Sequence, residues 1–81
     1  MLDSLQMANN KVVGVKQTNK ALAEDKVKTL YLAEDAEMYL VEKLKNTASN
    51  KGVEIVFVDS MKKLGKACGI DVSAAAVAIL K

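Results

Sequence analysis

Two short apolar segments, separated by one amphipathic helix pattern, limit the fold of this chain more than any other feature. Leu30–Ala33 is a compact apolar run, and Val53–Val58 consists almost entirely of β-branched or aromatic residues. Both segments predict strands that are buried on both faces. The helix pattern between them has one apolar face, formed by Leu40, Val41, Leu44 and Ala48. Strands of this kind need helices on both sides of their sheet.

The rest of the chain continues this alternation of helices and strands. Val12 and Val13 predict a short strand that ends at Gly14, and a helix is expected over Gln17–Asp25. Before this strand, a first helix capped by Asp3 or Ser4 is expected to run through Leu5, Met7 and Ala8. Later in the chain, Gly52 predicts a helix stop, and Ser60 predicts the cap of a helix over Met61–Cys68 that ends at Gly69. A last strand is expected over Ala74–Leu80, although its alanines would also suit a helix. We therefore expect one α/β domain over residues 1–81, a three-layer α/β/α sandwich with a four-stranded mixed sheet.

Composition narrows the setting. A hydrophobic content of 51% with 27% charged residues is typical of a globular domain. The longest apolar run, Ala74–Leu80, is far shorter than the ~18 residues that cross a membrane. The start of the chain lacks the pattern of a secretory signal, and its single cysteine has no partner for an internal disulfide. These features predict a cytoplasmic protein with no membrane association.

The inventory of reactive side chains argues against an enzyme. There is no histidine, so the commonest general base and a common metal ligand are missing. Cys68 has no histidine to activate it, which favours a buried structural cysteine. Glu34, Asp35 and Glu37 are either a carboxylate site or the solvated start of a helix, and the second interpretation is favoured because acids suit a helix N-terminus. We expect no catalytic residues, no metal and no cofactor.

Charge is distributed unevenly along the chain. The formal net charge is only +2, and all 12 basic residues are lysines. Six of them fall in two windows without acids, residues 11–20 and 60–70, and these are Lys11, Lys16, Lys20, Lys62, Lys63 and Lys66. Ordinary solvated lysines are one interpretation. The other is a surface with a positive side, opposed by the acidic cluster at 34–37.

The segment from Leu64 to Val72 is the more informative of the two basic windows. It runs a basic helix end into glycines and then sets Ile70 and Val72, separated by Asp71, in a loop. Apolar residues beside positive charge suit a ligand with a charged backbone and flat apolar faces, which nucleic acid has. The first window has matching polar chemistry.

In the first window, Lys16, Gln17 and Lys20 share one side of the predicted helix, because they are spaced three and four residues apart. The N–H groups at a helix start attract phosphate. The Gln17 amide offers both a donor and an acceptor to a base edge.

Two sequence blocks carry a family resemblance. The blocks are Gly14-Val15-Lys16-Gln17-Thr18-Asn19-Lys20-Ala21-Leu22 and Ser60-Met61-Lys62-Lys63-Leu64-Gly65-Lys66-Ala67-Cys68-Gly69-Ile70-Asp71-Val72. Over its whole length the chain resembles the kink-turn RNA-binding ribosomal protein superfamily of the L-seven-Ae and L-thirty-e types, and most of all its short bacterial YbxF-like branch. The second block is the more specific, with Leu-Gly-x-Ala-x-Gly followed by an aliphatic residue.

The resemblance implies a monomeric, non-enzymatic protein that binds kink-turns in ribosomal or structured regulatory RNA, with the ribosome as an expected partner. Lys16, Gln17 and Lys20 would face tandem G·A pairs and nearby phosphates, and Ile70–Val72 would cover the bulged bases. The implied RNA-binding residues are Gly14, Lys16, Gln17, Lys20, Lys62, Lys63, Gly65, Lys66, Gly69, Ile70, Asp71 and Val72, with the glycines allowing close approach or packing.

The chain differs from many members at two places. Lys16-Gln17 stands where archaeal and eukaryotic members typically carry Asn-Glu, and Ser73 stands where many have proline. The alternative function is a protein-interaction module of the same fold that uses the aliphatic loop Ile70–Val72. Salt separates the two, because RNA binding weakens steeply with salt and an apolar protein contact does not.

Overall fold

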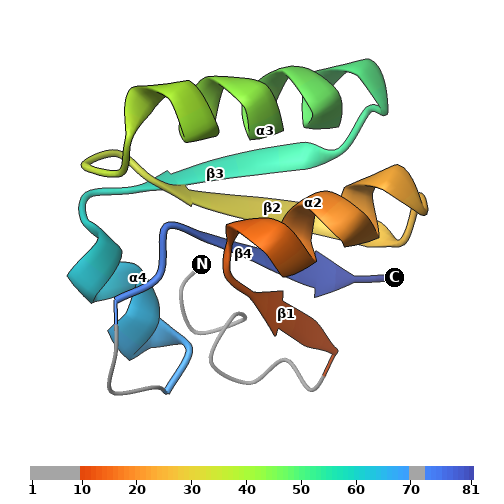
Figure 1. Cartoon of the computed structure of the whole chain (residues 1–81). Coiled ribbons are helices and arrows are strands. Elements are labelled where there is room, and N and C mark those ends of the chain that lie inside the picture. The colour runs from red at the N-terminus through yellow and green to blue at the C-terminus, as the bar shows by residue number, and fades with distance from the viewer. Residues whose placement is uncertain (1–9, 70–72) are drawn as a thin grey trace.

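A computed structural model describes residues 10–69 and 73–81 and arranges them in three layers (Figure 1). The helices α2 and α3 pack on one face of a four-stranded sheet, and α4 packs on the other. The elements are β1 (Lys11–Val13), α2 (Val15–Ala23), β2 (Val27–Ala33), α3 (Met38–Asn50), β3 (Glu54–Val58), α4 (Met61–Ala67) and β4 (Ala76–Leu80). The expected α/β/α sandwich is confirmed, and the helix expected near Ser4–Ala8 lies outside the described residues.

The sheet is mixed, with the strand order β1-β4-β2-β3. β2 and β3 are parallel, and α3 makes the crossover between them. β4 runs antiparallel to both β1 and β2, with Ala78 opposite Val12 on one side and Leu30 on the other. The strand that comes last in the chain therefore lies in the middle of the sheet.

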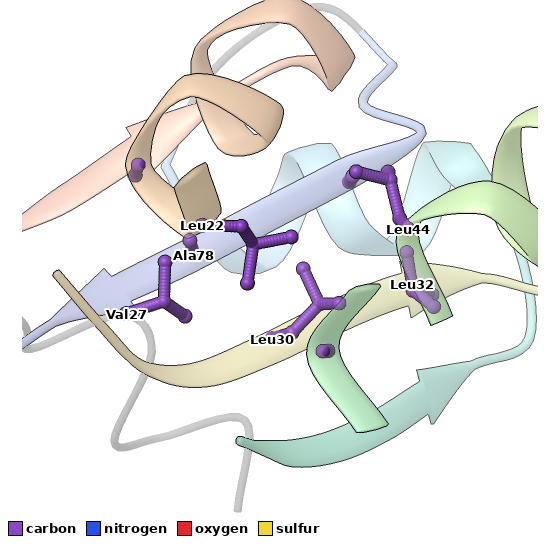
Figure 2. Packing of buried hydrophobic residues seen from close by; sticks show 9 residues of the cluster. Leu22, Val27, Leu30, Leu32, Leu44 and Ala78 are labelled. Atoms are coloured by element: carbon purple, nitrogen blue, oxygen red, sulfur yellow. The ribbon is translucent and has the colours of Figure 1, made fainter. Parts of the chain in front are cut away.

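The sheet separates the core into two halves, and β2 contributes side chains to both. Successive side chains of a strand point to opposite faces, so Leu30 and Leu32 pack toward α2 and α3, while Tyr31 packs toward α4. Figure 2 shows the first half, where Leu22 of α2 and Leu44 of α3 meet the β2 leucines. Truncating such a buried leucine to alanine costs about 2–5 kcal/mol.

The prediction that Val53–Val58 forms a strand buried on both faces is wrong in part. The strand exists as β3, but it lies at one edge of the sheet, and only Val58 is buried. Glu54 is exposed, and Phe57 exposes 44% of its surface. β-branched and aromatic residues suit central and edge strands alike, so composition did not reveal the missing neighbour.

The acidic cluster meets the expectation in part. Glu34, Asp35 and Glu37 are exposed, as predicted, and Glu37 is the N-cap residue of α3, but it makes no side-chain cap and the first turn from Met38 has no acid. The Met61 N–H, at the start of α4, donates to Asp35 Oδ1 at 2.7 Å. Asp35 therefore caps a helix on the far side of the sheet instead of the helix that follows it.

Candidate nucleic-acid interface

One end of the sheet brings the two predicted segments together. β1 ends beside the start of β4, and the Gly14 N–H donates to the Ala76 carbonyl oxygen at 2.8 Å. Just upstream, the Ala74 N–H donates to the Met61 carbonyl oxygen at 3.1 Å. Residues 73–76 thus connect the start of α2 with the start of α4. The two helices lie on opposite faces of the sheet but meet this segment at the same end.

Gly14 sets the direction in which α2 leaves the sheet. Its φ of 104° and ψ of 153° lie in a region that is nearly restricted to glycine. A Cβ added at this position would meet no atom within 4 Å. The backbone conformation, and not crowding, therefore requires glycine here.

The N-terminus of α2 has no side-chain cap from its N-cap residue, Gly14. Its first helical hydrogen bond runs from the Thr18 N–H to the Gly14 carbonyl oxygen (3.0 Å). Gly14 has no side chain that could cap the N–H groups between it and Thr18. The first turn contains no acid. Unpaired N–H groups and the aligned peptide dipoles give such an end partial positive charge, which attracts phosphate or another acceptor.

The predicted contact residues of α2 lie on its outer side. Lys16, Gln17 and Lys20 are exposed, whereas Ala21 and Leu22 are buried against the sheet. This places two ammonium groups and one carboxamide beside the uncapped helix start. Such a set can bind phosphates and at the same time hydrogen-bond to a base edge.

On α4, the predicted residues divide into an exposed and a buried group. Lys62, Lys63 and Lys66 are exposed, and Lys63 Nζ pairs with Asp59 Oδ2 at 3.1 Å. Gly65 is buried, as is Leu64 beside it, which agrees with the close packing that was one of its two expected roles. Ser60 caps this helix as expected, because its Oγ accepts a hydrogen bond from the Lys63 N–H at 3.1 Å.

The far end of α4 also agrees with the sequence pattern. Gly69 is exposed with a φ of 79°, and its N–H donates to the Lys66 carbonyl oxygen at 3.0 Å. Cys68 is buried, as predicted for a structural cysteine, and this burial raises the pKa of its thiol. Ile70, Asp71 and Val72 lie outside the described residues, so their assignment stays a prediction.

Sequence reasoning expected N–H groups at the start of α2 to attract phosphate, but it placed that start at Gln17 instead of Val15. Glycine at the cap position, where serine, threonine or aspartate would normally cap a helix, was the signal of an uncapped start. The contact of Asp35 with the start of α4 had no local signal, because the two residues are 26 positions apart.

Comparison with known proteins places this geometry in a family. A model of the Ribosomal protein L7Ae/L30e/S12e/Gadd45 family matches residues 1–81. The chain belongs to this family. The predicted resemblance is therefore confirmed, including the similarity to YbxF-like proteins described next.

Bacterial RNA-binding proteins resemble the chain over nearly its whole length. An RNA-binding protein of Bacillus pumilus is 53% identical over 78 residues, which are 96% of this chain and 95% of the relative. The RNA-binding protein YbxF of Geobacillus stearothermophilus is 47% identical over 79 residues, or 98% and 96% of the two chains.

Solved structures agree on the family fold. A 15.5kD RNA binding protein of Giardia lamblia superposes with a TM-score of 0.91 at 26% identity, covering 99% of this chain and 70% of that one. A Bacillus halodurans protein of unknown function superposes with a TM-score of 0.88 at 22% identity, over 99% and 83% of the chains. The second likeness concerns the fold alone.

The described residues form neither a metal site nor a membrane-spanning helix. In residues 10–69 and 73–81, no three cysteine or carboxylate side chains gather in a way that would hold a metal ion. In the same ranges, no helix has both the length and the apolar character needed to cross a bilayer.

Proposed function

We propose that this protein binds structured RNA and recognises kink-turns, without catalysing a reaction. The observation that carries the proposal is the start of α2, where exposed Lys16 and Gln17 flank N–H groups that have no side-chain cap from Gly14, beside the segment that leads to β4. Family membership supports it, because the relatives described above include RNA-binding proteins. Ribosomal or regulatory RNA in the cytoplasm, bound by a monomer, is the setting that we propose.

In this proposal the two helices have different roles. The start of α2 enters a widened groove, where the Gln17 amide bonds to a guanine edge while Lys16 and Lys20 neutralise nearby phosphates. The exposed α4 lysines add contacts to phosphate that are independent of base sequence. Ile70 and Val72 stack on unpaired bases of the bulge.

The test compares binding to a kink-turn with binding to a plain duplex. If Gln17 reads a base, Gln17→Ala should cost ~1–3 kcal/mol on the kink-turn and much less on the duplex. Lys62→Ala should weaken binding to both RNAs alike and reduce the salt slope by about one. Lys28→Ala, an exposed lysine near the opposite end of β2, is the matched control.

Isotherms at several salt concentrations decide the result. Equal losses on both RNAs for Gln17→Ala would remove base reading from the mechanism. An affinity that does not change with salt concentration would favour the protein-interaction module instead, because phosphate contacts release counterions and apolar contacts do not.

A further inference from the structure

A second surface lies on the β3 side of the sheet, away from α2. Among the described residues, the large hydrophobic side chains that are most exposed are Met38 at 75%, Tyr39 at 68% and Phe57 at 44%. Two of them, Met38 and Phe57, line a cavity of about 260 Å³ between the first turns of α3 and the end of β3. Its lining is Glu34, Ala36, Met38, Val41, Glu42 and Phe57, and we call it the acidic–apolar pocket.

The fold does not need these apolar side chains to be exposed. The buried face of α3 is made by Leu44 and Ala48, while Met38 and Tyr39 project from the first turn into solvent. Phe57 is exposed because β3 is an edge strand. Single exposed hydrophobic residues are ordinary, but apolar residues that gather around one cavity and have a polar rim mark an interaction site.

The size of the pocket indicates the kind of occupant. Sites for drug-sized ligands and cofactors typically measure about 300–1,000 Å³. A cavity of about 260 Å³ is smaller, and it suits one large apolar side chain presented by a partner. A buried apolar anchor with a polar rim is the usual arrangement at protein interfaces.

The charge of the pocket specifies the partner further. Glu34 and Glu42 line it, no lysine does, and Glu37 lies between Ala36 and Met38 in the chain. All three carboxylates are exposed, and none forms an ion pair within the described residues. Carboxylates here repel RNA phosphates and attract ammonium or guanidinium groups.

We propose that the acidic–apolar pocket docks a basic segment of another protein, with one apolar side chain in the cavity and flanking lysine or arginine residues against Glu34 and Glu42. This surface is separate from the open start of α2 and does not depend on RNA recognition. Complementary charge supplies orientation and rapid encounter, and the anchor supplies most of the affinity.

The test uses the full chain labelled with ¹⁵N and a set of short synthetic peptides. Each peptide has one central leucine, methionine or phenylalanine flanked by arginines or lysines. At least one should bind saturably and shift the amide signals of Glu34, Met38 and Phe57. Peptides with a central glycine, or with glutamates as flanking residues, should bind at least about tenfold more weakly, a factor that corresponds to ~1.4 kcal/mol.

Two variants and two controls make the test specific. Met38→Ser removes an exposed part of the lining, and Glu42→Lys reverses the rim charge, so each should weaken peptide binding about tenfold or more. Tyr39→Ser changes the same turn without touching the cavity, and Glu24→Lys makes the same charge change beyond the end of α2. Both controls should bind like the parent.

Three results would overturn the proposal. One is that no peptide binds saturably, and another is that the shifts fall outside the pocket. The third is that the pocket signals shift with protein concentration alone, because the occupant would then be a second copy of this chain.

Discussion

Thr18 has a hydroxyl group in an unfavourable place. The residue is fully buried in the first turns of α2, and its Oγ1 has no hydrogen-bond partner within the described residues. A buried polar group without a partner costs about 1–3 kcal/mol. Valine has nearly the same shape without the hydroxyl group.

We therefore expect Thr18→Val to raise the free energy of unfolding by about 1 kcal/mol. Urea denaturation followed by circular dichroism measures the change. Thr18→Ser keeps the hydroxyl and loses the methyl group, so it should destabilise the protein. A loss of stability in the valine variant would mean that the hydroxyl has a partner after all.

Gly14 is required by its backbone conformation, because its φ of 104° lies where an L-residue with a Cβ would be strained. Gly14→Ala should lower the free energy of unfolding by about 1–3 kcal/mol. A chemically synthesised chain with D-alanine at this position should show no such loss, because D-residues favour positive φ and the added Cβ meets no atom within 4 Å. Equal losses with both enantiomers would show that space, and not conformation, requires glycine.

At the scale of elements, α4 is a short helix whose start is held by two side chains. Ser60 Oγ accepts from the Lys63 N–H, and Asp35 Oδ1 accepts from the Met61 N–H. Each cap is expected to contribute about 0.5–2 kcal/mol. Asp35 also places a negative charge at the positive end of the helix.

Ser60→Ala and Asp35→Ala should therefore each destabilise the protein by about 1 kcal/mol, and Asp35→Asn by less, since an amide oxygen still accepts a hydrogen bond. Thermal unfolding of the three variants checks this order. Glu37→Ala is the control, because Glu37 makes no side-chain cap. If Asp35→Ala left the stability unchanged, the hydrogen bond from Asp35 to the start of α4 would not stabilise the protein.

The elements also show what could be read from the sequence. The apolar run of β2 and the apolar spacing of α3 express burial directly, so both elements were predicted, although β2 begins earlier, at Val27. The start of α2 was placed at Gln17 and is observed at Val15, because glycine gives no positive capping signal. The edge position of β3 and the reach of Asp35 depend on neighbours distant in sequence, which no local pattern encodes.

In the candidate site, too, the features that depend on local sequence were predictable. The exposed side of Lys16, Gln17 and Lys20 comes from helix periodicity alone and was predicted. Gly65 was assigned to RNA approach or to close packing, and its burial in α4 supports packing. The ion pair between Lys63 and Asp59 follows an i, i+4 spacing that was available in the sequence but was not used.

For the whole molecule, the buried Cys68 thiol and Tyr31 hydroxyl make the free energy of unfolding depend on pH in the alkaline range. Burial raises the pKa of the Cys68 thiol, and burial together with the charge of Glu54 raises the pKa of Tyr31. The folded state therefore holds these protons more tightly than the unfolded state does. The resulting stabilisation is complete below about pH 8.5, the ordinary value for a thiol, and is lost as the pH rises through the folded-state values.

Stability should accordingly fall as the pH is raised from ~8.5 to ~10.5, and Cys68→Ala should show a shallower fall over the first part of this range. Urea denaturation at a series of pH values measures both slopes. Only the slope is compared, since the alanine variant also loses packing. Identical slopes would assign the alkaline transition to other groups.

The central place of β4 has a consequence for synthesis on the ribosome. β2 and β3 pair with each other directly and do not need β4 for this contact, but the Gly14 N–H finds its acceptor only when Ala76 is available. At ~5–20 residues per second, the start of α2 waits for several seconds without its anchor. We expect a nascent chain without β4 to lack an ordered start of α2, so that the surface we propose for RNA binding forms only once β4 has joined the sheet.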